Sequence, residues 1–247
     1  MNKDIFYLLL PIHILALILL SISNFNLLLF FIGWFTIGCI GLEIGLHRYF
    51  SHKSFKLTKF LENVLATISI FAAQGGPLWW SSSHSHHHKF TDTDKDIHSP
   101  VQGKFFSFIG WYFKSNNVKI KKSLLLKNQY LKFIHKNHII IYWTTIIPCT
   151  LFLPETTLNL FLLPAIISFW GVNLVNLLCH YDFFGYRNYN TNDNSRNINW
   201  LSFLTWGLAL HNNHHRNPNC YNFRNKSKEI DISGFIIKKI FLRYMEN

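Results

Sequence analysis

Long apolar runs alternate with polar, charged segments along this chain. The runs that can be interpreted as membrane spans cover residues 5–23, 27–46, 139–153 and 157–178. A helix of about 20 residues crosses a hydrocarbon core of roughly 30 Å, which these runs approach. Only short polar turns separate the first run from the second and the third from the fourth. The pattern therefore predicts four transmembrane helices arranged as two hairpins.

The basic residues set the expected orientation of these hairpins. Lysine and arginine are absent from residues 4–47 and 137–186 and are concentrated in the segments that follow each hairpin. Because cytoplasmic segments of membrane proteins carry the excess of positive charge, both termini are expected in the cytoplasm, with residues 47–137 and 181–247 forming a helical cytoplasmic cap. We therefore predict an all-α, multi-pass integral membrane protein with a single domain spanning residues 1–247.

The composition supports a bilayer as the main partner. Hydrophobic residues make up 49% of the chain and charged residues only 15%, against a usual charged share of about 25%. The net charge of +12 is spread over the segments that flank the apolar runs, so nucleic acid is not expected as a partner. The four cysteines form no CxxC pair, and the first three, Cys39, Cys149 and Cys179, are expected to pack in apolar surroundings.

Several shorter patterns fall outside the four runs. Residues 61–73 predict an interfacial or buried helix, while residues 119–136 and 231–244 predict amphipathic helices on the bilayer surface. His13 is alone within the first run, so we expect it to face neighbouring helices. His135 and His138 have no further polar company and are interpreted as structural.

Two copies of the pattern HxxHH carry the candidate chemistry. The first contains His84, His87 and His88. The second follows the apolar stretch that ends before residue 211, and it contains His211, His214 and His215. On a helix, residues three and four apart share a face, so each triplet directs its imidazoles into one space. Such nitrogen clusters suit transition metals.

Two further histidine patterns lie at the ends of apolar runs. His47 and His52 form HxxxxH after the second run, and Asn176 and His180 share a helical face at the end of the fourth. Five residues along a regular α-helix change direction by about 140°, so His47 and His52 are not expected to hold one ion there and could each serve one of two neighbouring ions.

All of these patterns lie on the predicted cytoplasmic side, where they can meet just outside the bilayer. Nine imidazoles exceed what one metal binds, so we expect two metals. No HExxH pattern supplies the carboxylate base of a zinc hydrolase. Iron fits a nitrogen-rich site balanced by reduced oxygen species best, although the spacing alone leaves other metals open.

Acidic residues near these histidines have two possible roles. Glu43 lies near the end of the second run, where a carboxylate at the membrane interface is preferred over a contact to a metal ligand. Asp92, Asp94 and Asp96 alternate after the first HxxHH, but the glycine and glutamate of a calcium loop are missing. We therefore expect a solvated acidic turn.

Taken together, these stretches resemble the membrane fatty acid desaturases, most closely the branch of acyl-CoA desaturases and bacterial acyl-lipid desaturases that act at the ninth carbon. The resemblance rests on residues 45–52, 74–77, 84–96 with His98, 173–180, 184–189 and 211–215, and on the 229–231 tail. It covers most of the chain, and the combination of patterns is highly specific.

The resemblance implies a di-iron enzyme that uses dioxygen as co-substrate. It implies nine histidine ligands and Asn176 as a ligand through water; the histidines are His47, His52, His84, His87, His88, His180, His211, His214 and His215. His86 and His98 receive no ligand role. The expected reaction is oxidative desaturation of a fatty acyl chain, held as a CoA thioester or membrane lipid. No fused cytochrome domain is recognised, which implies a separate electron donor, either a ferredoxin or a b-type cytochrome, and we expect location in the bacterial inner membrane.

The sequence also departs from that family. Residues 206–210 replace the usual Gly-Glu-Gly-Trp before the last histidine pattern, and Ser85 replaces an arginine. An acyl hydroxylase or acetylenase with the same metals is therefore the alternative outcome, since the reaction depends on geometry. A membrane metal transporter or sensor is the alternative from another class. It is disfavoured because transporters place polar ligands near the bilayer midplane, whereas these histidines lie beyond the span ends.

Overall fold

The computed structural model describes residues 4–114, 118, 120 and 127–241. Within these residues the chain is helical, and extended pairing is limited to the isolated bridges Tyr186–Asn197 and Asn197–Leu210. The predicted all-α class is therefore confirmed.

The apolar runs form long helical segments that are partly wound as π-helices. In the first hairpin, one arm is η1 (Ile5–Leu9) with α1 (Leu10–Ile22), and the other is α2 (Leu27–Trp34) with η2 (Phe35–Ser51). In the second hairpin, one arm is α6 (Gln129–Phe152), and the other is α7 (Pro154–Thr156), η7 (Thr157–Leu162) and α8 (Leu163–Leu178). Two continuous stretches, Leu27–Ser51 and Pro154–Leu178, are long and apolar enough to cross a membrane, while Phe6–Ile22 is apolar but shorter. The four-span arrangement stays a prediction.

Hydrogen bonds join the tips of the two hairpins. Asn26 caps α2 by accepting a hydrogen bond from the Leu29 amide (3.1 Å), and its own amide donates to Asn159 Oδ1 (3.0 Å). The buried Asn159 side chain also donates to the Asn24 carbonyl (2.9 Å). These bonds satisfy backbone groups in an apolar region and fix the first hairpin against the second.

The second hairpin differs from expectation at its start. α6 begins at Gln129 and runs without a break, so the helix expected on the bilayer surface and the third apolar run are one helix from this point. No proline or glycine lies between them to end the helix. The earlier part of that expected surface helix, at residues 119 and 121–126, lies outside the described residues. His13 faces α8 as predicted, because its Nε2 accepts a hydrogen bond from Trp170 Nε1 (3.1 Å).

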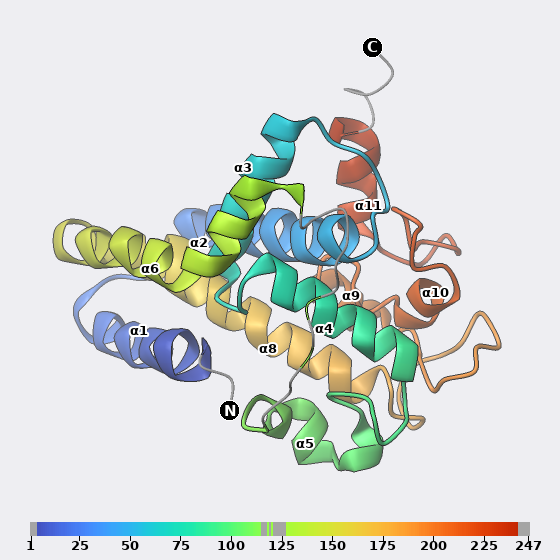
Figure 1. Ribbon diagram of the computed structural model, residues 1–247. Helices are drawn as coiled ribbons and strands as arrows, with labels where there is room; N and C mark the ends of the chain where they lie inside the picture. The colour runs from blue at the N-terminus through green and yellow to red at the C-terminus, as the bar shows by residue number, and fades with distance from the viewer. Residues whose placement is uncertain (1–3, 115–117, 119, 121–126, 242–247) are drawn as a thin grey trace.

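Shorter helices form the rest of the molecule. Their bounds are α3 (Lys59–Ser69), η3 (Ile70–Ala72), α4 (Pro77–Phe90), η4 (Pro100–Gln102), α5 (Lys104–Phe108), η5 (Gly110–Tyr112), α9 (Asn199–Leu204), α10 (His211–Arg216), α11 (Ile232–Ile236) and η8 (Ile237–Phe241). Figure 1 shows the apolar ends of α1, α2 and α6 at the left, with α4, α9 and α10 meeting the end of α8 at the right. The ends of helices that carry histidines therefore lie in one part of the fold.

Candidate functional site

The winding of η2 places His47 and His52 on one face. In a π-helix each amide bonds to the carbonyl five residues earlier, and the His52 amide donates to the His47 carbonyl (3.3 Å) in this way. The regular α-helix assumed from sequence would have separated these two side chains. That expectation was wrong, and both imidazoles point into the same space.

The α4 helix supplies the next three imidazoles. It begins at Pro77, which suits the first helical turn because its missing N–H would be unpaired there. His84, His87 and His88 lie on its last turns, and His87 is almost completely buried. The predicted HxxHH helix is present.

The last four imidazoles come from α8 and α10. His180 follows α8 directly, four residues after Asn176, whose carbonyl accepts a hydrogen bond from Ser107 Oγ (3.1 Å). α10 is only six residues long. The buried Asn197 stabilises its start, because Asn197 Oδ1 accepts hydrogen bonds from the amides of Asn212 (2.9 Å) and Asn213 (3.2 Å).

The nine histidines form two neighbouring groups of four and one residue between them. In each group the candidate ligand nitrogens all lie within 4.8 Å of one another. The first histidine group consists of His47, His52, His84 and His214, and the second histidine group consists of His87, His180, His211 and His215. His88 lies between the groups, with its Nε2 2.8 Å from His214 Nε2 and its ring centroid 4.5 Å from that of His215.

Within each group the Nε2 atoms face one another at short range. His84 Nε2 lies 2.7 Å from His52 Nε2 in the first group, and His211 Nε2 lies 2.9 Å from His180 Nε2 in the second. The opposite ring nitrogen, Nδ1, is held by a carboxylate in four of these residues.

Four carboxylates orient the rings. The Nδ1 atoms of His47, His87, His180 and His215 lie 2.9 Å from Glu43, 3.0 Å from Asp96, 3.3 Å from Asp92 and 2.9 Å from Asp193, respectively. A carboxylate only accepts, so each Nδ1 carries the proton and each Nε2 presents a lone pair to its group. Histidines arranged in this way commonly bind metals through Nε2.

These contacts correct two expectations and add one residue. Glu43 is 1% exposed and bonds to His47, so the preferred role at the membrane interface was wrong and the other role holds. Asp96 is also 1% exposed, and Asp92 is bonded, so only the exposed Asp94 fits the expected solvated turn. Asp193 was missed, since it lies in a polar, asparagine-rich loop whose sequence gives no sign of its partner.

Burial keeps seven of these imidazoles neutral. Together with neighbouring histidines, it lowers the pKa of His88 to about 3. The pKa values of six others are likewise held well below the ordinary value, namely those of His52, His84, His87, His211, His214 and His215. Neutral lone pairs that face each other at under 3 Å repel, and a cation between them would remove that repulsion. The residues present therefore fit two transition-metal ions.

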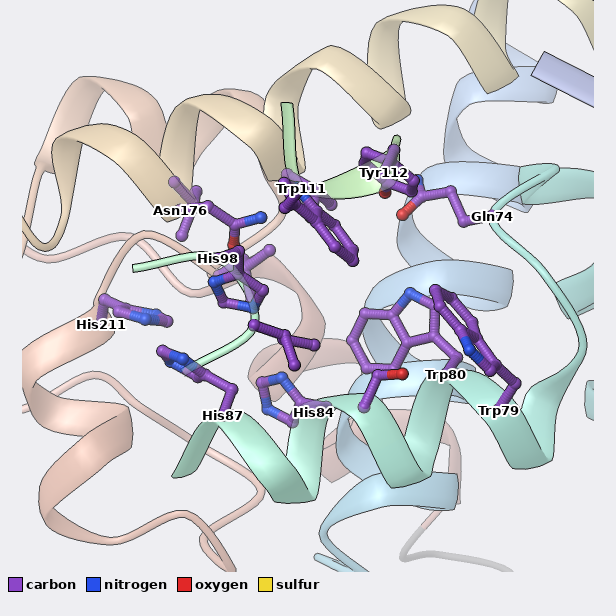
Figure 2. Close-up of a pocket in the computed structure, with 15 residues that line it drawn as sticks. Gln74, Trp79, Trp80, His84, His87, His98, Trp111, Tyr112, Asn176 and His211 are labelled. Carbon is purple, nitrogen blue, oxygen red and sulfur yellow. The ribbon is translucent and has the colours of Figure 1, made fainter. Parts of the chain in front are cut away.

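An apolar cavity reaches both histidine groups. Its walls include Trp79, Trp80, Trp111, Ile97, Val172 and Val175. Figure 2 shows it between α4 and α8, with His84, His87 and His211 toward one end and Gln74 and Tyr112 toward the other. Asn176 and His98 line the same cavity. The arrangement can hold an apolar chain against imidazoles from both groups.

Known proteins resemble this chain over nearly its whole length. It is 36% identical to the Delta-9 desaturase-like 4 protein of Arabidopsis thaliana over 92% of this chain and 77% of that protein. It is 32% identical to Delta-9 acyl-lipid desaturase 2 of the same plant, over 92% of this chain and 76% of that protein. An acyl-CoA 5-desaturase of Anemone leveillei is 34% identical over 81% of this chain and 64% of that protein.

The model of the fatty acid desaturase family matches residues 23–226. This match includes every histidine of both groups and the cavity between α4 and α8. The apolar helices agree with membrane association, as expected of this family. The chain therefore belongs to the membrane fatty acid desaturase family, and it is an oxidoreductase.

Proposed function

We propose that this protein is a di-iron, oxygen-dependent desaturase that introduces a double bond into a long fatty acyl chain, in a position resembling that of the delta-9 enzymes. The observation that carries the proposal is the apolar cavity, which ends against His84 of the first histidine group and His87 and His211 of the second. A chain in this cavity would lie beside both metal positions at once.

The proposed ligands are the nine imidazoles, with Asn176 acting through a water molecule. Bound iron would supply the activation of dioxygen and the removal of hydrogen from two adjacent methylenes. The protein's own contribution is to hold each imidazole in one orientation, which the carboxylates beside His47, His87, His180 and His215 do. Neutral nitrogen ligands also leave the metal charge available to stabilise reduced oxygen.

The cavity walls would position the substrate and exclude water. Trp79, Trp80 and Trp111 surround the space where the acyl chain would lie, and their flat faces match an extended methylene chain. An unactivated methylene offers no acidic proton, so the reaction needs no acid–base pair, and the histidines are committed to metal binding. Water exclusion favours reaction at the chain over side reactions.

Relatives of this chain differ in the position of the double bond and in the head group that their names give. Relatives are named both as Delta-9 acyl-lipid and as acyl-CoA 5-desaturases. Leu208, where the family commonly has glutamate, lines the cavity beside His211. Because the reaction outcome depends on the geometry beside the metals, an acyl hydroxylase or acetylenase is kept as the alternative.

We further propose four membrane spans with both termini and the histidine groups on the cytoplasmic side, and a separate ferredoxin or b-type cytochrome as electron donor. The lysine and arginine distribution supports this orientation. The relatives named above are plant proteins, whereas a bacterial inner membrane was expected from sequence, and the host membrane stays a prediction.

Product analysis tests the proposal. Cells that express the protein are given an isotope-labelled saturated fatty acid, and the labelled products are identified. We expect a monounsaturated product from the wild type and from His86→Ala, and none from His87→Ala. His86 is the matched control because it lies beside His87 on α4 but bonds to the Lys95 carbonyl (2.9 Å) outside both groups. A hydroxylated product without a new double bond would favour the alternative.

A further inference from the structure

We propose that Arg48 is a positioning residue that holds the first histidine group through two buried carboxylates, Glu43 and Asp231. The inference rests on the proposed function, since it concerns one of the two metal positions. Asp231 belongs to the C-terminal segment, residues 223–241, which supplies none of the proposed ligands. This segment would therefore contribute to the site through contacts alone.

The Arg48 guanidinium is completely buried and bonded on two sides. Its Nε donates to Glu43 Oε1 (2.9 Å), while Nη1 and Nη2 donate to the two oxygens of Asp231 (3.0 and 2.8 Å). This forked geometry fixes both the position and the plane of the Asp231 carboxylate, which a lysine ammonium cannot do, while the single bond from Nε anchors one oxygen of Glu43.

Glu43 transmits this constraint to the first histidine group. Its Oε1 is held by Arg48, so Oε2 remains for His47 Nδ1, 2.9 Å away. The bond fixes the rotation of the His47 ring and directs its Nε2 toward His214 Nε2, 3.2 Å away. Without Arg48, the buried Glu43 carboxylate would lose its charge partner and turn away from this geometry.

Asp231 connects the same guanidinium to the C-terminal segment. Besides Arg48, it accepts hydrogen bonds from the amides of Phe223 (2.6 Å) and Gly234 (2.8 Å), the second at the start of α11. The Phe223 ring lies 3.9 Å from Arg48 Cζ, and its centroid is 4.7 Å from that of His214. The segment therefore reaches two imidazoles of the first group, one through Glu43 and one through Phe223.

The Arg48 and Asp231 side chains have little space to move. Gly207 has a φ of +116°, and a Cβ placed there would lie 2.8 Å from Arg48 Nη2 and would also overlap Asp231. The second histidine group has separate supports, since Asp92, Asp96 and Asp193 hold its rings and, within the described part of the chain, none of them bonds to Arg48 or Asp231. Weakening the Arg48–Asp231 pair should therefore affect one metal position selectively.

Iron content per folded chain tests this inference. The full-length protein, purified in detergent and reconstituted with ferrous iron, is compared with Asp231→Asn, Arg48→Lys and the control Asp182→Asn, which removes the same charge at an exposed residue. Size-exclusion chromatography isolates the monodisperse fraction of each protein, and circular dichroism checks that this fraction is folded. We expect about two irons in the wild type and the control, and about one in both Asp231→Asn and Arg48→Lys. After the iron is oxidised to the ferric state by dioxygen, electron paramagnetic resonance should then report an isolated iron in place of a coupled pair. Arg48→Lys is the milder variant if Asp231→Asn folds poorly.

Other outcomes overturn the inference. If either folded variant keeps both irons, or loses both together, the pair does not position one site selectively. If the wild type itself binds no iron, the proposed function fails and this inference fails with it. If the wild type binds two irons and only the variants behave otherwise, this inference fails alone.

Discussion

The two histidine groups differ in what holds their imidazoles. In the second group, three carboxylates, Asp92, Asp96 and Asp193, bond to ring nitrogens, and none pairs with lysine or arginine among the described residues. In the first group only Glu43 does so, and it pairs with Arg48, whose single positive charge is shared with Asp231. The electrostatic environment of the second group is therefore more negative than that of the first.

This difference indicates that the two proposed metal positions are unequal. Nearby uncompensated negative charge favours a bound dication. In addition, three of the four imidazoles in the second group are buried and only His215 is half-buried, whereas both His52 and His84 are half-buried in the first group. We expect the second group to retain its metal more tightly and the first to exchange it more readily.

The largest effect is expected from Asp96→Asn. Asp96 is buried, holds His87 Nδ1 with both oxygens (3.0 Å each) and accepts bonds from two backbone amides. Loss of its charge should weaken metal binding and desaturation by about 10–100-fold. Iron titration and product rate measure this. Asp94→Asn, in the same segment but exposed, is the control, and an equal loss in both variants would contradict the role given to Asp96.

Graded chelation should remove the two metals in order. With a soluble chelator, iron at the first group should leave about tenfold faster than iron at the second, a difference of about 1.4 kcal/mol. Stopped-flow absorbance of the chelator complex would show two phases of equal amplitude. In Asp96→Asn the slow phase should accelerate and approach the fast one. A single phase in the wild type would show that the groups are equivalent.

The smallest effect is expected from Asp193→Asn, through pH-dependent stability. Burial raises the pKa of Asp193, but the hydrogen bonds from His215, Ser195 and Thr191 lower it more, so the net pKa is well below its ordinary 3.8. Since the folded pKa is the lower one, the carboxylate's contribution is present above pH 3.8 and is lost only as pH falls through the folded value.

We therefore expect metal-free Asp193→Asn to be less stable by about 1–2 kcal/mol, with the same deficit at every pH between about 5 and 8. Thermal unfolding in detergent at several pH values measures this deficit. A deficit that shrinks steadily across that range would mean that another group dominates the titration near His215.

Local patterns were sufficient to predict the histidine helices. The spacings within His84–His88 and His211–His215 specify one helical face without reference to the rest of the chain. α4 and α10 both form, and their imidazoles meet. The membrane hairpins were predicted with less detail, because hydropathy marks apolar length but not where α6 begins.

The supports of the site depend on tertiary contacts that no local pattern encodes. Asp193 bonds to His215, and Asp92 bonds to His180, 88 positions later in the chain. The alternating aspartates of residues 92–96 look like a solvated turn until the fold brings His87 and His180 against them. The winding of η2 was also hidden, since nothing in its composition distinguishes a π-helix from an α-helix.

The winding of η2 also constrains how this family can change in length. His47 and His52 share a five-residue register that continues back along η2. An inserted or deleted residue between Asn26 and His47 would rotate both imidazoles away from their partners at once. The exposed residues 182–184 carry no such coupling and should tolerate gain or loss of residues. We therefore expect insertions and deletions among homologues to occur in the loop of residues 182–184 and not in the helix that contains η2.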